Sequence, residues 1–478
     1  MNNNYDLVVG LEIHVELKTN TKAFCHCKNE FGAGINTNVC PVCMGLPGAL
    51  PTINKTCVEY AIKSGLAFES EISNTAFFER KNYFYPDLSK AYQISQLEKP
   101  ICVGGRVKYN LNGEEKYTRI NNIHMEEDAG KSIHDAKLGK SLIDFNRCGV
   151  PLIEIVTEPD ITSPEEAVAT LTAIKETLVA IGVSDCKMQE GSLRCDVNIS
   201  IKPKGSNKLG TRTEMKNLNS FKAVARAIEF EANRQAECLE NGETIRQITL
   251  KWDDAKCKNE PLRSKEASND YRYFPDPDLL PLQITHEYIN QIKNSLPELP
   301  YDKRLRYINE LGLSEHDANI LTTNGKVTEF FEQCLALKNE PKFVANWVMT
   351  DIMRKLKESL LDEPEITVSA KNFVDLITMF QNKEISINNA REILDKIWNT
   401  NESATSLAER LGLKQVNNED EVKNFVLEII ANNPQAVADY KAGNDRAITF
   451  FVGQVMKATK GKANPQIVRK ILAEELNK

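Results

Sequence analysis

The sequence contains no segment typical of a membrane or secreted protein. No apolar run in its 478 residues approaches the roughly 20 residues that a membrane-spanning helix needs. No basic-then-apolar segment precedes the first strand pattern, which begins near residue 5 and leaves little room for a targeting peptide. Hydrophobic residues make up 41% and charged residues 27% of the chain, as in soluble globular proteins. We expect a cytoplasmic protein of two or three domains that has no membrane partner.

Cysteine is scarce, and its placement is uneven. Four of the twelve cysteines fall between residues 25 and 43, which suits a reducing compartment with one metal cluster better than a disulfide framework. These four are Cys25, Cys27, Cys40 and Cys43, two close pairs separated by twelve residues. The spacing predicts a tetrahedral structural zinc site, whose closed shell of four thiolates supports folding rather than catalysis. A redox pair of Cys40 and Cys43 is the alternative, but the segment that follows does not offer the helix N-terminus that such a pair needs.

The standard nucleotide-binding motifs are also absent. Residues 130–132, Gly-Lys-Ser, look like the end of a P-loop, but the position that requires the upstream glycine holds Met125. No G-x-G-x-x-G motif occurs either. A nucleotide site in this chain must therefore be of another design.

A net charge of −7 argues against a protein that is coated by nucleic acid. The C-terminal segment differs, because residues 440–478 contain eight Lys or Arg and three Asp or Glu, a net charge of +5. This basic segment is either a contact for a polyanion or a solvated helix face.

The most informative pattern is a strand with acids and a histidine on one face. Residues 10–17 alternate, with apolar side chains at the odd positions and Glu12, His14 and Glu16 at the even ones. A second acidic run, His-Met-Glu-Glu-Asp, occupies residues 124–128. Clustered carboxylates repel one another unless a cation is bound between them. The two segments together predict a metal-dependent active site.

Two further strands repeat the pattern. Residues 193–200 place Arg194 and Asp196 on their polar face, and residues 211–216 place Glu214 on theirs. Carboxylates suit Mg²⁺, Mn²⁺ or Ca²⁺, and the neighbouring cationic side chains suit a phosphate. This combination is typical of phosphoryl transfer. The alternative is that these are surface strands with ordinary salt bridges. One strand of this kind would fit that alternative, but four strands with the same pattern favour an active site.

An aromatic and basic loop occupies residues 80–87, Arg-Lys-Asn-Tyr-Phe-Tyr-Pro-Asp. It could stack on a nucleobase with Lys81 on a phosphate. The alternative is a core strand that ends at the proline, so this segment alone decides little.

The distribution of strand and helix patterns indicates the domain organisation. Strands recur irregularly over residues 1–293 together with helices that begin at the N-caps Ser163 and Ser220. This favours an α+β fold with a largely antiparallel sheet over a Rossmann fold. We expect an all-helical domain over residues 294–407 and a small helical tail domain over residues 408–478.

Several segments recur together, and in the same order, in one known family. They are residues 12–17, 80–87, 91–95, 124–131, 151–154, 190–196, 216–220, 271–275 and 452–457. Over essentially its whole length the chain resembles the B subunit of the glutamyl-/aspartyl-tRNA amidotransferases.

The resemblance implies a heterotrimer whose other members are an amidase, the A subunit, and a small C subunit. The B subunit would use ATP and Mg²⁺ to phosphorylate the side-chain carboxylate of mischarged Glu-tRNA(Gln) or Asp-tRNA(Asn). Ammonia that the amidase releases from glutamine would then displace the phosphate. The first domain would be the cradle for this kinase site, and the helical and tail domains would grip the tRNA.

The resemblance also implies roles for single residues. His14 and Glu127 would bind the catalytic Mg²⁺ and, with Glu12, form the catalytic set. A second cation site would be formed by four acids, Glu12, Glu126, Asp196 and Glu214. Lys81 and Arg194 would face the phosphates of ATP.

Two features qualify the resemblance, and two alternative functions remain open. Some members of the family lack the four cysteines, so zinc would belong to the scaffold. The chain has no Ser-rich amidase signature, so ammonia would have to come from a partner. The rival functions are a metal-dependent phosphohydrolase and a non-catalytic, zinc-stabilised tRNA-binding adaptor.

Overall fold

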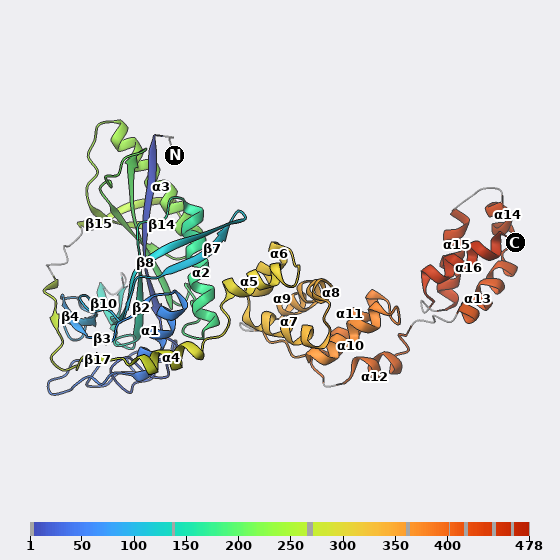
Figure 1. The fold of residues 1–478 in the computed structure, drawn as a ribbon, viewed down its shortest axis with the longest axis horizontal. Helices are drawn as coiled ribbons and strands as arrows, with labels where there is room; N and C mark the ends of the chain where they lie inside the picture. Colours follow the sequence, from blue (N-terminus) through green and yellow to red (C-terminus); the bar gives the residue numbers. More distant parts are fainter. Residues whose placement is uncertain are drawn as a thin grey trace. The chain divides into compact units, whose positions relative to one another are not determined.

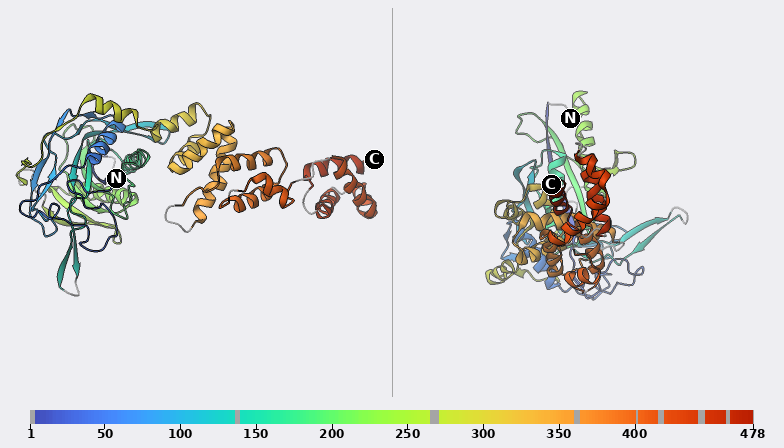
Figure 2. Two further views of the ribbon diagram at one scale, coloured as in Figure 1. Left: turned by 90° about the horizontal axis from the view of Figure 1, so that it is seen from below. Right: turned by 90° about the vertical axis from the view of Figure 1, so that its right-hand side faces the viewer.

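The computed structural model describes residues 4–135, 139–264, 271–359, 364–400, 402–414, 419–441, 446–459 and 463–477. The chain divides into two compact units, Met1–Lys303 and Arg304–Lys478. The first unit combines strands and helices, and the described part of the second is helical (Figures 1 and 2). Helices and sheets together agree with the predicted α+β class.

A ten-stranded sheet forms the centre of the first unit, in the order β15-β14-β13-β12-β1-β11-β8-β6-β2, with β7 paired to β8. The strands of this sheet are β1 (Tyr5–Glu16), β2 (Glu71–Ile72), β6 (Cys102–Val103), β7 (Arg106–Leu111), β8 (Glu114–Glu127), β11 (Pro151–Thr157), β12 (Leu193–Pro203), β13 (Thr213–Leu218), β14 (Ile248–Asp253) and β15 (Lys258–Ser264). Among the described residues of this sheet, β13 and β14 pair in parallel and the other strand pairs are antiparallel.

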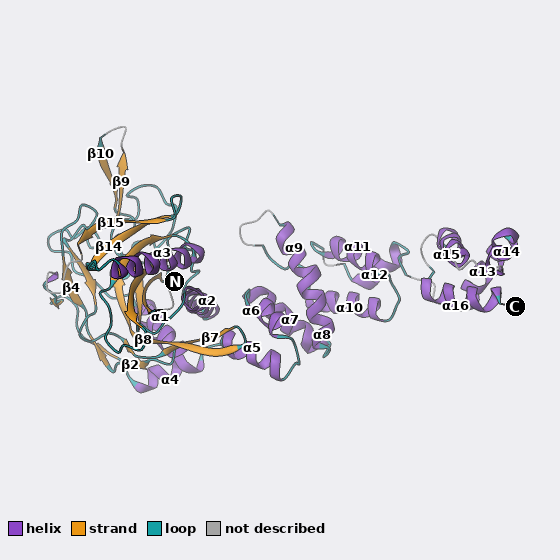
Figure 3. Ribbon diagram, turned by 90° about the horizontal axis from the view of Figure 1, so that it is seen from above, coloured by secondary structure: helices purple, strands orange, loops and turns teal. Residues whose placement is uncertain are grey.

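Three helices cover the apolar face of the sheet. They are α1 (Lys55–Ala67), α2 (Pro164–Ala180) and α3 (Phe221–Glu240) (Figure 3). Their apolar side chains share one core with the odd-numbered residues of β1. Ile13 and Val15 are fully buried there, and burial of such a side chain contributes about 1.5–3 kcal/mol. The opposite face of β1 is left for Glu12, His14 and Glu16, as the alternation predicts.

The two predicted helix starts are confirmed. Ser163 caps α2, with its side chain accepting from the Glu166 amide at 3.1 Å, and Pro164 follows in the first turn. Ser220 caps α3 in the same way, accepting from the Ala223 amide at 3.0 Å.

Smaller sheets complete the first unit. One contains β4 (Glu79–Asn82), β5 (Tyr92–Ser95) and β16 (Phe274–Pro275), and another pairs β3 (Thr75–Ala76) with β17 (Leu282–Gln283). The strands β9 (Lys131–Asp135) and β10 (Lys140–Asp144) form a hairpin that projects from the large sheet (Figure 3). The helix α4 (His286–Asn294) packs against α1.

The helices of the rest of the chain have two separate cores. The first is formed by α5 (Pro300–Asn309), α6 (Glu315–Thr322), α7 (Gly325–Leu337), α8 (Pro341–Trp347), a π-helical turn (Val348–Ile352), α9 (Met353–Glu358), α10 (Ala370–Gln381), α11 (Ile387–Ile397) and α12 (Ala404–Arg410). The second is formed by α13 (Glu419–Asn432), α14 (Pro434–Lys441), α15 (Arg446–Ala458) and α16 (Pro465–Leu476).

The predicted boundary between residues 407 and 408 falls inside α12, whose Ala408 belongs to the first helical core. Of the charged residues predicted to make the C-terminal segment basic, Lys460, Lys462, Lys478 and Asp445 lie outside the described residues. None of the described helices is both long and apolar enough to span a bilayer.

Candidate active site

The candidate functional side chains lie on the polar face of β1 and its neighbours. The register sets His14 opposite Glu154 of β11 on one side and opposite Arg194 of β12 on the other. Glu12 lies opposite Asp196 of β12. Because side chains alternate across a pleated strand, residues far apart in sequence converge on this face in a fixed order.

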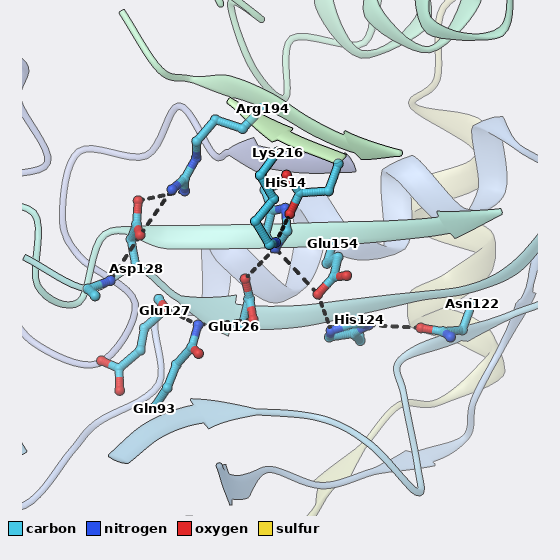
Figure 4. Close-up of polar contacts among 12 residues, drawn as sticks. His14, Gln93, Asn122, His124, Glu126, Glu127, Asp128, Glu154, Arg194 and Lys216 are labelled. Carbon is cyan, nitrogen blue, oxygen red and sulfur yellow. Dashed lines mark hydrogen bonds and ion pairs between the residues drawn. The ribbon is translucent and has the colours of Figure 1, made fainter. Parts of the chain in front are cut away.

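The first group of possible metal ligands is formed by His14, Glu126 and Glu154. The Nε2 atom of His14 lies 3.5 Å from Glu126 Oε1 and 3.6 Å from Glu154 Oε2, between the two carboxylates (Figure 4). One ligand atom from each residue falls within 4.8 Å of the others. Burial raises the pKa of Glu126, and the charge of Glu154 adds to this effect. Burial also opposes ionisation of Glu154, but the two neighbouring histidines outweigh it and hold its pKa well below the usual range.

Hydrogen bonds orient both carboxylates of this group. The Gln93 amide donates to Glu126 Oε2 at 3.0 Å and to the Glu127 carbonyl at 2.7 Å. His124 Nε2 lies 3.1 Å from Glu154 Oε2, and its Nδ1 lies 2.8 Å from Asn122 Oδ1. Such outer contacts fix the direction of a ligand and tune its affinity for a metal.

Glu127 is not part of this group, although the resemblance pairs it with His14. Its carboxylate forms an ion pair with Lys90 and accepts from the Ile94 amide at 3.0 Å, on the side away from His14 (Figure 4). Adjacent residues of a strand point to opposite faces, so Glu126 and Glu127 separate. The structure therefore sets Glu126 and Glu154, rather than Glu127, beside His14.

The second group is formed by Glu12, Asp196 and Glu214, whose oxygens also lie within 4.8 Å of one another. The Lys216 ammonium forms an ion pair with Asp196 and lies 3.3 Å from Glu214 Oε1. Asn198 donates to Glu12 Oε1 at 2.8 Å. The structure thus brings together three of the four acids predicted for a second cation, whereas Glu126 lies in the first group.

The predicted phosphate-facing residues lie beside these groups. Lys81 is close to the Tyr271 ring, 5.0 Å from its centroid. Burial lowers the pKa of Lys81, but the charges of Glu126 and of nearby acidic groups outweigh it, so the net shift is upward. Arg194 donates to Asp128 Oδ2 at 2.6 Å (Figure 4). Acidic side chains thus stabilise the charge of both cations.

Glu16 is the last residue of β1 on the face that carries Glu12 and His14, and it lies near Arg194 and Asp128. Burial and the charge of Asp128 raise the pKa of Glu16 to about 7. A carboxyl group with such a pKa, next to possible ligands, is characteristic of functional sites.

The four predicted zinc ligands converge in a separate loop. The Sγ atoms of Cys25, Cys27, Cys40 and Cys43 lie within 4.8 Å of one another. A hydrogen bond from Cys25 is the main cause that lowers the pKa of Cys43 to about 4. The Cys40 amide donates to Cys43 Sγ at 3.2 Å. Four converging sulfurs, one of them favoured as a thiolate, fit a tetrahedral zinc ion.

The sequence did not single out Glu154 or Gln93 as site residues. Glu154 is the only polar residue between Leu152 and Val156, and that isolated acid in an apolar strand was the available signal. Gln93 lies in β5, whose pattern indicates only a core strand.

Comparison with known proteins assigns the family. Residues 7–290 match the model of the GatB/GatE catalytic domain, and residues 329–476 match that of the GatB domain. The B subunit of the aspartyl/glutamyl-tRNA(Asn/Gln) amidotransferase from Thermoanaerobacter pseudethanolicus is 50% identical over 474 residues, 99% of this chain and 100% of the relative. The chain belongs to this family.

Other members support the assignment over the full length. The B subunit of Caldicellulosiruptor saccharolyticus is 50% identical over 477 residues, which is 99% of each chain. The first B subunit of Clostridium acetobutylicum is 47% identical over 475 residues, again 99% of each chain. All three groups of possible metal ligands fall inside the part that matches the catalytic-domain model.

We expect Glu154→Gln to weaken the binding of Mn²⁺, used as a spectroscopic substitute for Mg²⁺, because it removes one anionic ligand. Loss of an outer contact alone costs about 10–100-fold in affinity, so the decrease should be at least roughly tenfold. Titration followed by electron paramagnetic resonance measures it, with Glu229→Gln on the exposed face of α3 as the control. Equal affinity in Glu154→Gln and wild type would remove Glu154 from the ligand set.

We expect Cys40→Ser to lose zinc, because three sulfurs no longer close the coordination shell, and to lower the melting temperature. Metal analysis of the purified chain should give about one zinc ion for wild type. Cys257→Ser is the matched control, since Cys257 is exposed and outside the cluster. Full zinc content in Cys40→Ser would contradict the assignment.

Proposed function

We propose that this chain is the ATP-dependent activating subunit of a tRNA-dependent amidotransferase. The observation that carries the proposal is the pair of metal-ligand groups on one sheet face, in a chain that is half identical to named B subunits. The substrate would be the side-chain carboxylate of Glu-tRNA(Gln), Asp-tRNA(Asn) or both. The products would be Gln-tRNA(Gln) and Asn-tRNA(Asn).

The chemistry explains why such a site needs cations. A carboxylate is a poor electrophile toward ammonia until one oxygen has become part of a leaving phosphate. A carboxylate oxygen attacks the γ-phosphorus of ATP and ADP leaves. Ammonia then adds to the acyl carbon, loses a proton and expels inorganic phosphate. The carboxamide that forms is the side chain of glutamine or asparagine.

The residues of the two groups fit this task. His14, Glu126 and Glu154 would hold one Mg²⁺, and Glu12, Asp196 and Glu214 a second divalent cation. Bound Mg²⁺ supplies charge neutralisation for the phosphoryl group in transfer.

The cations beside the two groups would orient the phosphates. Lys81 is half-buried next to the first group, and Arg194 is held by Asp128. Glu127 is not a metal ligand in this proposal, because its carboxylate is bound by Lys90 and by the Ile94 amide.

The chain also needs partners for the complete reaction. Its family name denotes one subunit of a larger enzyme, and the sequence has no amidase signature. We infer that two further proteins, an amidase (the A subunit) and a small C subunit, complete a cytoplasmic heterotrimer, and that the four-cysteine loop holds a structural zinc ion. The domains would then be a cradle with the kinase site, a helical domain and a tail that binds tRNA.

ATP hydrolysis by the assembled enzyme tests the proposal. Glu-tRNA or Asp-tRNA should stimulate hydrolysis by wild type. Glu126→Gln should lower the stimulated rate by roughly 100-fold or more, since lost electrostatic stabilisation of a transition state costs that much. Glu127→Ala should lower it less, because Lys90 and the Ile94 amide hold Glu127 outside the ligand group. Binding of tRNA should survive in both variants, and Glu229→Gln should behave as wild type.

Each rival function predicts another outcome of this experiment. Stimulation that survives both substitutions would favour the non-catalytic adaptor. A rate of ATP hydrolysis that is the same with and without charged tRNA would favour the phosphohydrolase.

Removal of residues 415–478 should weaken tRNA binding and leave Mn²⁺ affinity unchanged. The truncation retains the first helical core together with Leu413, which packs against that core. It removes the second helical core. Gel-shift titration with tRNA measures the loss. Undiminished binding would mean that the basic C-terminal segment is only a solvated face.

A further inference from the structure

A row of cations lies along the segment that leaves the polar sheet face at the end of β12. The end of β12 and the connection to β13 carry Lys202, Lys204, Lys208 and Arg212, and no acid occurs in the sequence between Asp196 and Glu214. An acid from another strand is nearby, since Asp6 of β1 lies opposite Lys202 and accepts from the Gly205 amide at 3.4 Å. We call residues 202–212 the basic loop. Lys204, Lys208 and Arg212 are exposed. Within the described part of the chain, none of the four side chains forms an ion pair or hydrogen bond.

The other cations of this face differ. Lys216 and Arg194 are held by acids of the candidate site. Cations without an acidic partner in the described part of the chain are available to bind an anion. In a chain of net charge −7, such a local excess of positive charge is a suitable contact for a polyanion.

A hollow separates the basic loop from the second ligand group. Its volume is about 450 Å³, within the range of ligand sites. Gly10, Glu12 and Asn198 line it from the strands, and Gly210, Thr211 and Arg212 line it from the loop.

Two glycines shape this hollow. A Cβ on Gly210 would lie 2.1 Å from the Ile201 carbonyl oxygen, so glycine is required where the loop passes β12. A Cβ on Gly10 would meet nothing closer than 3.7 Å, so a side chain there would fit but would occupy the hollow.

The hollow meets the second ligand group at Glu12, which lines it. Gly10, Glu12 and His14 follow one another on the same face of β1, at about 6.6 Å for each pair of residues. A ligand in the hollow therefore reaches the acids of the second group first and His14 next.

We propose that the basic loop and the hollow receive the 3′ end of the charged tRNA. Phosphates of the single-stranded end contact Lys204, Lys208 and Arg212, and the terminal nucleoside occupies the hollow. The amino acid that it carries then extends toward Glu12 and its neighbours. This inference rests on the proposed function and assigns a path to its substrate.

The spread of the cations favours a nucleic-acid strand over ATP. A triphosphate needs positive groups that converge on one point, whereas a strand presents one phosphate for each nucleotide along an extended path. Lys204, Lys208 and Arg212 are distributed along an open loop. The exposed Leu209 between them offers an apolar contact for a sugar or base.

Charge reversal in the assembled enzyme tests the path. The double variant Lys204→Glu/Lys208→Glu should raise the KM for charged tRNA by roughly tenfold or more in tRNA-stimulated ATP hydrolysis. The kcat and the KM for ATP should stay at their wild-type values. With alanine at both positions, the slope of log affinity against log salt should fall by about 1 for each phosphate that the loop no longer binds.

Matched control variants distinguish loss of the proposed tRNA contacts from nonspecific effects of changing surface charge. Lysine-to-arginine changes at both positions should restore tRNA affinity. Lys99→Glu should have no effect, because this exposed lysine precedes β6, toward the opposite edge of the sheet. Gly10→Val should raise the KM for charged tRNA, while unchanged Mn²⁺ affinity shows that the sheet and ligand groups are intact.

The outcomes distinguish this inference from the proposed function. An unchanged KM in the double variant, with normal stimulation of wild type, would overturn the path and leave the proposed function standing. A double variant that no longer assembles with its partner proteins would mark the loop as a protein interface and also overturn the path. If charged tRNA stimulates no hydrolysis at all, fluorescence anisotropy with uncharged tRNA still decides, because equal affinity of wild type and double variant overturns the path.

Discussion

The two faces of strand β1 must meet opposite requirements, and the rest of the first unit depends on this constraint. The odd positions are apolar and fully enclosed by the core under three helices. The even positions carry acids and a histidine that an apolar core would not tolerate. A strand with period two satisfies both, because successive side chains leave it on opposite sides. The apolar face supplies the free energy that holds the charged face together.

That charged face is electrostatically costly by itself. Two carboxylates share the space around His14, and three more crowd near Lys216. Burial raises the pKa of Glu126 and so disfavours its charged form. Such clusters persist when the fold over-determines them, and they are typical of sites that bind cations. The internal cations Lys216 and Lys81 offset part of the repulsion in the absence of ligands.

Prediction from sequence succeeded where local chemistry decides structure. Helix starts at Ser163 and Ser220 follow from side-chain caps within three residues. The cysteine loop converges because its two pairs lie close in sequence. The partners of His14 were harder to predict, since β11 and β8 lie more than a hundred residues further along the chain. The alternation of side chains along a strand predicts which face of the sheet a residue occupies, but it does not predict which strand is the neighbour.

The sequence by itself determined the family, the polar face of β1 and the types of candidate ligand, because these depend on residue identity and on a backbone period of two. Tertiary structure decided which candidate ligands lie side by side. It sets Glu154 and Glu126 beside His14, and it ties Glu127 to Lys90. It also leaves the basic loop next to a hollow. These results require the strand order and register of the sheet, and those are set by long-range packing that no local pattern contains.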